Sequence, residues 1–445
     1  MTVEGVTRFT LVLYKYQKTR YNILNKEHIV RMFIMIQIIY YIFFCLTLFY
    51  GLYYSLTGLY GFFKPKKFRI LPNEPKNKFA IIIAARNEEA VVGNLVTSLL
   101  DCNYPKELYD VYVAVNNTTD NTAKVAREAG AIVIDVKKKV KSKGEVLCYV
   151  FDELKSHKDI DAYIIFDADN IVHPDFLSRM NDTLCCGYRV AQGFRDSKNI
   201  SDNWISGSYS LFYYMQNFFF NKSRMTLNQS CSINGTGFMI KKEIIDKDGF
   251  HTYTMTEDIE FTAQCALKDE RVAFVENAIT YDEQPVEFKA SWKQRKRWSV
   301  GCLQCARLYW KDLLKHFITT GSQPSFDMFM NFIAPVVQVI CLMEFFALIV
   351  FRVFNVKLYD LFSTLFSSGT VFFILTYVSG IIISLFILKY NKRKAKNVLS
   401  AIALFALFIL TWVPINVVCI FTKNMKWEEI KHNRGIKSTE LKFNK

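Results

Sequence analysis

Long runs of hydrophobic residues divide this 445-residue sequence into membrane-type and soluble parts. The first run, residues 32–63, contains no charged residue and is too long for a buried strand or an ordinary core helix. Three further runs lie at about 329–351, 371–388 and 398–421. The pattern predicts membrane-spanning helices on both sides of a soluble region, and the length of the first run argues against a cleavable signal peptide.

The soluble region alternates between short apolar runs and stretches in which apolar residues recur at helical spacing. The predicted strands are FAIIIAA, DVYVAV, AIVIDV and AYIIF, at residues 79–85, 110–115, 131–136 and 162–166. Predicted helices lie between these strands, at 88–102, at about 120–129 and after Lys143. This alternation predicts an α/β fold in which helices cover a parallel sheet and crossovers are right-handed.

These patterns predict four consecutive parts of the chain. They are a basic segment with the first transmembrane helix (1–63), a soluble domain (64–323), about three C-terminal membrane helices (324–423) and a basic tail (424–445). The soluble part is large enough for one globular domain inserted between membrane helices.

Basic residues cluster beside the apolar runs, and the sequence carries a net charge of +15. Lys and Arg gather at 64–69 and 391–397, which is typical of the cytoplasmic flanks of membrane helices. We therefore expect an integral protein of the cell (plasma) membrane with a cytoplasmic domain, in contact with membrane lipids and not with nucleic acid. One membrane-spanning helix before the domain and three after it would place both basic termini outside the cell, although basic flanks usually stay on the cytoplasmic side. It is therefore left open that one apolar segment lies in the membrane interface instead of crossing the membrane.

Polar side chains follow three of the predicted strands. Arg86 and Glu88 come after the first strand, Asn116 after the second, and Asp167 and Asp169 after the fourth. Ligands of open α/β sheets bind beyond the carboxyl ends of the strands, so we expect these residues to line one binding edge. The sequence contains neither a G-x-G-x-x-G after the first strand nor a Walker loop, which are the usual phosphate cradles.

Asp167 and Asp169 are spaced to share one ligand. In an extended chain, residues i and i+2 point to the same side, so both carboxylates are expected to face one spot and to attract a cation. A divalent ion such as Mg²⁺ is held by one or two carboxylates together with substrate phosphates. The alternative interpretation is a strand-end turn with an Asx cap, which is common.

Two later motifs favour the metal interpretation. T-E-D lies at 256–258 and Q-R-K-R-W at 294–298. In order and spacing with D-x-D, they resemble the membrane-embedded family 2 glycosyltransferases, which include cellulose, chitin, hyaluronan and bacterial poly-N-acetylglucosamine synthases. The resemblance covers about residues 79–304 and implies a nucleotide-diphospho-sugar transferase (glycosyltransferase A) Rossmann-like domain inserted between transmembrane helices.

The resemblance also implies a role for each matching residue. Asp258 matches the general base, and Asp169 the ligand of Mg²⁺ or Mn²⁺ on the sugar-nucleotide diphosphate, with Asp167 near the ribose and the metal. Trp298 matches the ring under the acceptor sugar, beside which Glu257 is expected to contact the acceptor. The other matches are expected to bind the nucleotide sugar, and they are Arg297 at the diphosphate, Gln294, Lys143, Arg86, Glu88 and Asn116.

The chemistry of Asp258 supports the base assignment without the family. One-step inversion at a sugar carbon needs a carboxylate that takes the proton of the acceptor hydroxyl. The sequence TMTE (254–257) has capping-box spacing, so we expect Asp258 in the first turn of a helix, whose dipole keeps it ionised. The alternatives are a helix-start acid without further duty, and for Trp298 an anchor in the membrane interface.

The main hypothesis is an inverting glycosyltransferase that moves a sugar from a nucleotide diphosphate, expected to be UDP, to a growing β-linked polysaccharide at the membrane. Asn116 departs from the Asp that many family members place at the uracil, which weakens the expectation for UDP. One alternative is a non-processive transferase with a lipid-linked acceptor, and an accessory membrane protein is a possible partner. A transporter with a ligand-binding domain would account for Glu344 inside an apolar run, but it leaves the motifs unexplained.

Overall fold

The computed structural model describes residues 31–32, 34–64, 70–353, 369–422, 436 and 438–440. The chain forms two compact units, one made of residues 1–52 and 337–371 and the other of residues 53–336 and 372–445. The predicted basic segment before residue 31, most of the cluster at 64–69 and most of the tail at 424–445 lie outside the described residues.

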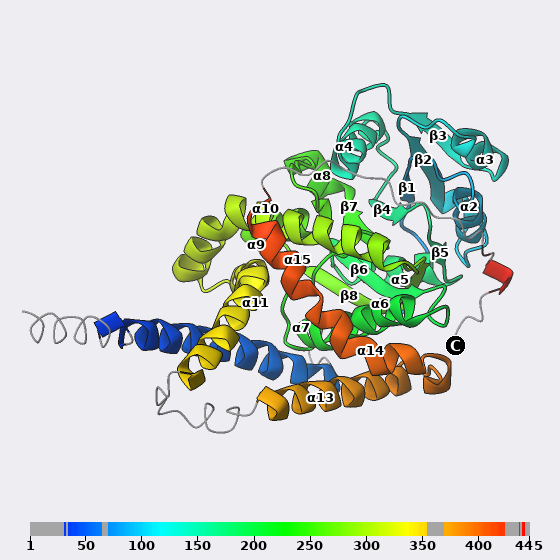
Figure 1. Ribbon diagram of the computed structural model, residues 1–445. Coiled ribbons are helices and arrows are strands. Elements are labelled where there is room, and N and C mark those ends of the chain that lie inside the picture. Colours follow the sequence, from blue (N-terminus) through cyan, green and yellow to red (C-terminus); the bar gives the residue numbers. More distant parts are fainter. Residues whose placement is uncertain are drawn as a thin grey trace, which may run out of the picture. The chain divides into compact units, whose positions relative to one another are not determined.

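The second unit is built around an eight-stranded sheet (Figure 1). Its strands are β1 (Phe79–Ala85), β2 (Tyr109–Val115), β3 (Ile132–Asp135), β4 (Ala162–Asp167), β5 (Ile171–Val172), β6 (Val190–Ser197), β7 (Phe238–Lys241) and β8 (Val272–Asp282). They lie in the order β3-β2-β1-β4-β7-β6-β8-β5. The four predicted strands are confirmed as β1 to β4. The pairs that they form, β1 with β2, β1 with β4 and β2 with β3, are all parallel, as expected.

The direction of β7 determines which strand ends meet. β7 is antiparallel to both β4 and β6, so β6 runs in the same direction as β4. β8 in turn is parallel to β6. The carboxyl ends of β1, β2, β4, β6 and β8 therefore lie at one edge of the sheet, where ligands of α/β proteins bind.

Helices cover this sheet. They are α2 (Val92–Leu100), α3 (Thr122–Glu128), α4 (Lys143–Leu154), α5 (Phe176–Cys185), α6 (Trp204–Met215), α7 (Ser223–Thr226), α8 (Lys242–Asp248), α9 (Glu257–Leu267) and α10 (Phe288–Thr320). A π-helical stretch, Gln216–Lys222, continues α6. The central strands are buried: Phe79, Ile81 and Ile83 of β1 and Ile164 of β4 are fully buried, as expected for parallel strands covered on both faces.

Local sequence accounts for two features near the ligand edge, the start of α4 and a register shift in β6. Ser142 caps α4 by accepting a hydrogen bond from the backbone N–H of Glu145, so the helix begins at Lys143. In β6 the register shifts between Gly193 and Phe194. A Cβ at Gly193 would lie 2.6 Å from the carbonyl oxygen of Ala278, so only glycine admits this close approach of backbones.

Three helices of the described residues are long and apolar enough to cross a membrane, at Ile34–Phe62, Gln323–Phe351 and Leu399–Ile420. The prediction of a fourth such run at 371–388 corresponds to α13 (Gly369–Tyr390), whose described apolar part, Ile374–Tyr390, is shorter. Gln323–Phe351 belongs to α11 (Gln323–Val353).

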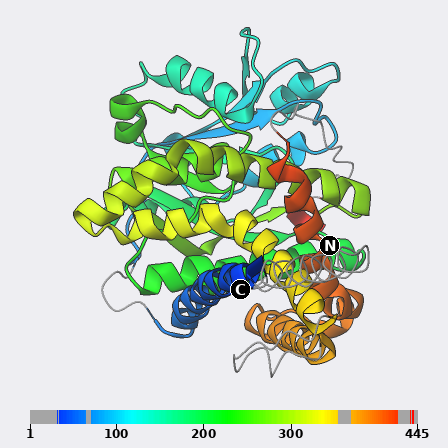
Figure 2. The ribbon, with the colours of Figure 1, turned by 60° about the vertical axis from the view of Figure 1, so that its left-hand side comes forward.

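The predicted span at 398–421 corresponds to the apolar helical stretch Leu399–Ile420. It consists of α14 (Leu399–Leu410) and α15 (Trp412–Ile420), which are separated at Thr411. α14 packs on α6, and α15 packs on α10 through Val300, Leu303, Ile415 and Cys419. Figure 2 shows α15 beside α10 from a second direction. This segment therefore packs on the helices of the sheet domain along much of its length. Whether one apolar segment lies in the membrane interface stays a prediction.

Candidate active site

Lys143 joins two parts of the ligand edge that are far apart in sequence. Its ammonium donates hydrogen bonds to Oδ1 of Asp167 and to the carbonyl oxygen of Gly235, each at 2.6 Å. Oε1 of Glu257 lies 3.5 Å from the same nitrogen. Lys143 therefore brings the end of β4, the turn at Gly235 and the start of α9 together around one positive charge.

Asp167 is held as an anion. Burial acts to raise the pKa of its carboxyl, but the ammonium of Lys143, with Arg195 and Arg297, holds that pKa below the ordinary value. This arrangement keeps a permanent negative charge at the end of β4.

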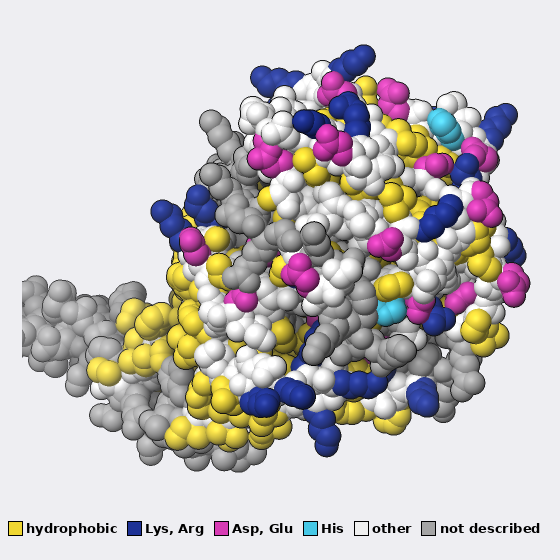
Figure 3. All heavy atoms as spheres, turned by 90° about the vertical axis from the view of Figure 1, so that its right-hand side faces the viewer, with side chains coloured by type: hydrophobic (Ala, Val, Ile, Leu, Met, Phe, Trp, Pro, Cys, Tyr) yellow, Lys and Arg dark blue, Asp and Glu magenta, His cyan; other side chains and the backbone are white. Residues whose placement is uncertain are grey.

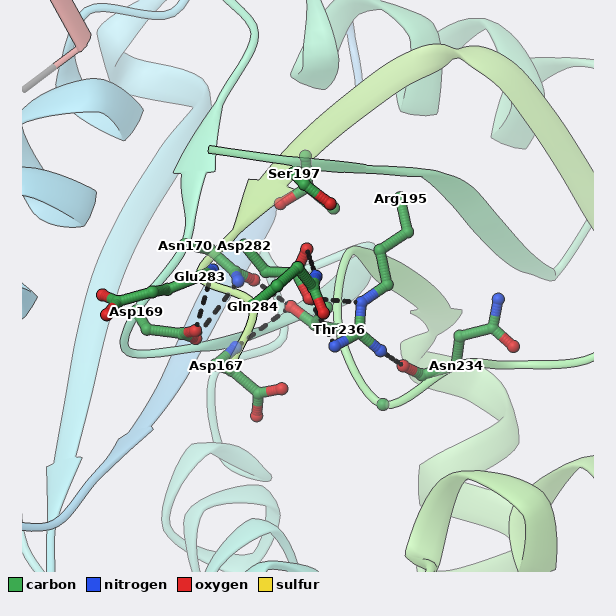
Figure 4. Close-up of polar contacts among 12 residues, drawn as sticks. Asp167, Asp169, Asn170, Arg195, Ser197, Asn234, Thr236, Asp282, Glu283 and Gln284 are labelled. Atoms are coloured by element: carbon green, nitrogen blue, oxygen red, sulfur yellow. Dashed lines mark hydrogen bonds and ion pairs between the residues drawn. The ribbon is translucent and has the colours of Figure 1, made fainter. Parts of the chain in front are cut away.

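Asp169 does not continue the strand as expected. β4 ends at Asp167, and Asp169 lies in the following turn, so the extended-chain argument for two carboxylates on one side is wrong in its geometry. Its Oδ2 accepts a hydrogen bond from the backbone N–H of Glu283 at 3.2 Å, and its Oδ1 accepts one from Asn170 at 3.3 Å (Figure 4). The turn still leaves both carboxylates at the same end of β4.

Arg195 and Asp282 form a buried ion pair at the same edge. Nε of Arg195 donates to Oδ2 of Asp282 at 2.6 Å, and Nη1 donates to the carbonyl oxygen of Asn234 at 2.9 Å. Figure 4 shows the guanidinium of Arg195 between these two partners. Burial raises the pKa of Asp282 to about 6 even though Arg195 is paired with it.

Asp258 lies in the first turn of α9, as predicted, but not for the predicted reason. The N-cap is Thr256, not Thr254, and among the described residues its side chain makes no capping hydrogen bond. Oε2 of Glu260 instead accepts hydrogen bonds from the backbone N–H groups of Tyr253 and Thr254, in the loop before the helix. The capping-box interpretation of TMTE is therefore wrong.

The expectation that the helix dipole keeps Asp258 ionised is also wrong. Burial and the negative charge of Glu257 raise its pKa to about 7, although the backbone N–H of Ile259 and the ammonium of Lys143 act in the opposite direction. Its carboxylate lies against the turn at Gly235, where an added Cβ would come within 3.2 Å of Oδ2. Asp258 therefore exchanges a proton near neutral pH.

The Q-R-K-R-W residues lie near the start of α10. Arg297 is partly exposed and acts electrostatically on Asp167, so α10 reaches the D-x-D end of β4. The ring of Trp298 is partly buried and packs edge-on against Tyr209 and Tyr213. The side-chain oxygen of Gln294 is buried without a hydrogen-bond partner in the described part of the chain. The predicted acceptor and diphosphate roles of these residues stay predictions.

The ends of β1 and β2 supply the other predicted donor residues. Arg86 is exposed and Glu88 is partly buried. Asn116 is buried, and its amide nitrogen donates to the carbonyl oxygens of Val136 and Lys138. The oxygen of Asn116 accepts from the amide of Asn117. The amide nitrogen of Asn116 is therefore engaged by backbone carbonyls, and its oxygen is the group that can accept a hydrogen bond from a ligand.

The site fits a divalent metal in one particular way. No group of three or more His, Cys, Asp and Glu side chains in the described ranges is arranged to hold an ion by itself. Asp167 and Asp169 supply two carboxylates at one strand end, and ions such as Mg²⁺ are completed by phosphate oxygens of a substrate. The residues present therefore fit a metal that arrives with a diphosphate.

Sequence reasoning missed Arg195, Asp282, Glu283 and Lys198. The segment TYDEQP follows the apolar run of β8, so Asp282 and Glu283 carry the same strand-end signal that identified Asp167. Arg195 lies near the end of β6, and Lys198 directly follows this strand. The sequence pattern does not show that β6 and β8 end at the same edge of the sheet as β4, and the residues at their ends were missed for this reason.

The chain is similar to known glycosyltransferases. The family model described as "Glycosyltransferase like family 2" matches residues 75–301, which is more than half of the chain. The probable glycosyltransferase YdaM of Bacillus subtilis is 25% identical over 377 residues, covering 80% of this chain and 83% of YdaM. A beta-monoglucosyldiacylglycerol synthase of Nostoc sp. is 25% identical over 264 residues, covering 56% of this chain and 54% of the synthase. The chain thus spans about half the length of that synthase.

A solved structure shares the fold. The mannosyltransferase PcManGT from Pyrobaculum calidifontis, in complex with GDP-Man and Mn²⁺, matches with a TM-score of 0.54 and 14% identity, covering 85% of this chain and 99% of that one. This likeness supports the predicted glycosyltransferase A type of α/β fold. With the family match, the sheet and the edge that gathers D-x-D, T-E-D and Q-x-x-R-W, the chain belongs to the family 2 glycosyltransferases.

Proposed function

We propose that this enzyme transfers a sugar, with inversion, from a nucleotide diphosphate to an acceptor hydroxyl at the membrane, and that Asp258 is the general base. The observation that carries the proposal is the position of Asp258, whose pKa is about 7, beside the turn at Gly235 that receives Lys143. A base with a pKa near the working pH transfers protons efficiently. Asp258 takes the acceptor proton as the acceptor oxygen attacks the sugar carbon and the bond to the diphosphate oxygen breaks.

The leaving diphosphate is neutralised by cations of this chain. Lys143 and Arg297 both lie within electrostatic reach of Asp167, so they flank the position expected for the diphosphate. A Mg²⁺ or Mn²⁺ ion on Asp167 and Asp169 would add Lewis-acid stabilisation of the same negative charge. Arg86, Glu88, Asn116 and Gln294 complete the proposed donor site.

We propose UDP as the nucleotide, because the oxygen of Asn116 can accept a hydrogen bond from the N–H of uracil. The amide nitrogen of Asn116 already donates to two backbone carbonyls. A uridine donor therefore meets the acceptor oxygen of this side chain. Comparing turnover of UDP-sugars with turnover of GDP-sugars tests this choice directly.

The acceptor is proposed to be a growing β-linked polysaccharide that contacts Trp298 and Glu257, at the cytoplasmic face of the plasma membrane. The second candidate is single addition to a lipid, and the relatives named as beta-monoglucosyldiacylglycerol synthases favour it. The apolar helices of the chain suit either acceptor, since both remain at the membrane. Figure 3 shows one face of the molecule, on which hydrophobic side chains gather at the lower left and Lys and Arg side chains lie beside them.

The test uses purified protein in detergent with a panel of UDP-sugars and GDP-sugars, with Mn²⁺ and with EDTA. Metal-dependent release of nucleoside diphosphate is the expected result, and it excludes a transporter as the sole function. Mass spectrometry of the product after addition of diacylglycerol or an oligosaccharide separates the two acceptors by product length. Absence of turnover with every donor would contradict the proposed function.

A further inference from the structure

Lys198 is a half-buried lysine at the ligand edge that the proposed reaction has not yet used. It follows the last residue of β6, and its backbone N–H donates to the carbonyl oxygen of Asp282 at 2.9 Å. Its ammonium nitrogen is buried and makes no hydrogen bond to any described residue. The backbone of Lys198 is therefore fixed, while its charged end is left without a direct protein partner within the described ranges.

Acidic side chains surround this ammonium without contacting it. Asp169, Glu283, Asp282 and Glu88 all act on it electrostatically, with Asp169 the strongest. These four come from the turn after β4, the end of β8 and the segment after β1, so the ammonium of Lys198 lies within electrostatic reach of the ends of these strands. Its charge is therefore directed to the place where D-x-D is expected to hold the donor.

The other cations of the site behave differently. Lys143 contacts Asp167 at 2.6 Å, and Arg195 contacts Asp282 at the same distance, so each is compensated by a protein carboxylate. An ammonium that is removed from water without such a partner is costly to the folded state. No hydrogen bond to a described residue offsets the cost of burying this ammonium. An anionic ligand would supply the missing partner.

We propose that Lys198 binds the diphosphate of the nucleotide-sugar donor, as a positive charge beside the D-x-D acids. This inference rests on the proposed function and deepens it, because it adds a donor-binding residue on β6 to those predicted on β1, β4 and α10. Asp167 and Asp169 are the carboxylates proposed to hold the divalent cation, and Lys198 supplies a positive charge for the phosphate oxygens that accompany that cation.

The test is nucleotide binding by the full chain in detergent, measured by calorimetry with UDP and with GDP in the presence of Mn²⁺. Lys198→Met removes the charge and keeps most of the side-chain volume, and Lys198→Arg keeps the charge. We expect Lys198→Met to bind the nucleoside diphosphate at least about tenfold more weakly, as for loss of a charged hydrogen bond, and Lys198→Arg to bind with an intermediate affinity. Lys124→Met, at an exposed lysine of α3, is the matched control and is expected to bind like the unaltered protein.

Two further measurements separate this role from a merely structural one. Because the ammonium is unpaired, Lys198→Met is expected to unfold at the same temperature as the unaltered protein or higher, whereas loss of a structural ion pair would lower that temperature. Mn²⁺ binding without nucleotide, followed by electron paramagnetic resonance, is expected to be unchanged or tighter, because a positive charge near the metal acids has been removed.

The outcomes distinguish the inference from the function on which it rests. If the unaltered protein binds UDP or GDP and Lys198→Met binds it equally well, the diphosphate role of Lys198 is wrong while the proposed function stands. If Lys198→Met loses nucleotide binding together with thermal stability, Lys198 is structural and the inference fails. If the unaltered protein binds neither nucleotide, the proposed function is wrong, and the inference about Lys198 is wrong as well.

Discussion

The end of β4 and the start of α9 each place a carboxylate near Lys143, and the two carboxylates differ in protonation. Asp167 contacts the ammonium directly, and its pKa is held below the ordinary value. Asp258 has Glu257 beside it, and burial with this like charge raises its pKa to about 7. Environments that separate two pKa values in one site assign different tasks to chemically identical groups. Asp167 is suited to bind a cation, and Asp258 is suited to exchange a proton.

The largest expected effect comes from removing the exchangeable carboxylate. Asp258→Asn is expected to lower the turnover rate by roughly 10²–10⁴-fold, the usual contribution of a general base, because no group replaces Asp258 as proton acceptor. Nucleotide binding is expected to persist, since the cations at β4 are unchanged. Turnover is measured as nucleoside diphosphate release, and binding by calorimetry.

Asp101→Asn is the control for that substitution, because Asp101 is exposed at the end of α2 and lies outside the site. It is expected to leave turnover unchanged. Asp167→Asn tests the other side of the comparison and is expected to weaken Mn²⁺ and nucleotide binding. If Asp258→Asn retained full turnover, the base assignment would be untenable.

The next effect comes from removing the charge that the two carboxylates share. Lys143→Met leaves Asp167 at the ligand edge without its closest cation, and because this pair is only partly buried we expect a cost of about 1–3 kcal/mol. We expect a lower unfolding temperature together with a higher pKa of both Asp167 and Asp258, because the ammonium lowers both. Calorimetric unfolding with and without nucleotide measures the loss. An unchanged unfolding temperature would show that the contacts at Lys143 contribute little.

A smaller effect is expected from crowding the contact between α4 and α9. A Cβ at Gly144 would lie 2.1 Å from Oγ1 of Thr252 and 3.2 Å from Cβ of Glu257, so Gly144→Ala forces these elements apart. Overpacking of this kind typically costs about 1–3 kcal/mol. The double variant Gly144→Ala with Thr252→Ala removes the closest clash and is expected to recover part of the stability and turnover. If the double variant were no more stable than Gly144→Ala, the clash with Thr252 would not be the cause of the lost stability.

The smallest effect is a shift in pH dependence. Only ionised Asp258 accepts a proton, so the rate is expected to fall with decreasing pH below its pKa of about 7. Glu257→Gln removes a charge that raises this pKa, so the acid limb of the profile is expected to move to lower pH. Single-turnover rates over a pH series measure the limb. A limb that stays in place would mean that Asp258 does not set it.

Local pattern predicted a large part of this fold, and tertiary contacts explain the rest. β1 to β4, the α/β class and the position of Asp258 in a first helical turn were predicted correctly, because strand and helix periodicities are visible within short windows. The capping box at TMTE and the extended D-x-D were wrong. α9 begins after Thr256 and β4 ends at Asp167, and such element boundaries are the part of a fold that short sequence windows fix least.

By itself, the sequence determined the order of strands and helices, the apolar segments and the motifs whose spacing carries the family. The tertiary structure alone decided that β6 and β8 end beside β4, through the antiparallel β7, and so brought Arg195, Lys198 and Asp282 to the ligand edge. It also decided that Asp258 has a pKa of about 7. The reason is that pKa values and ion pairs depend on burial and on distances between residues far apart in sequence, which no local pattern encodes.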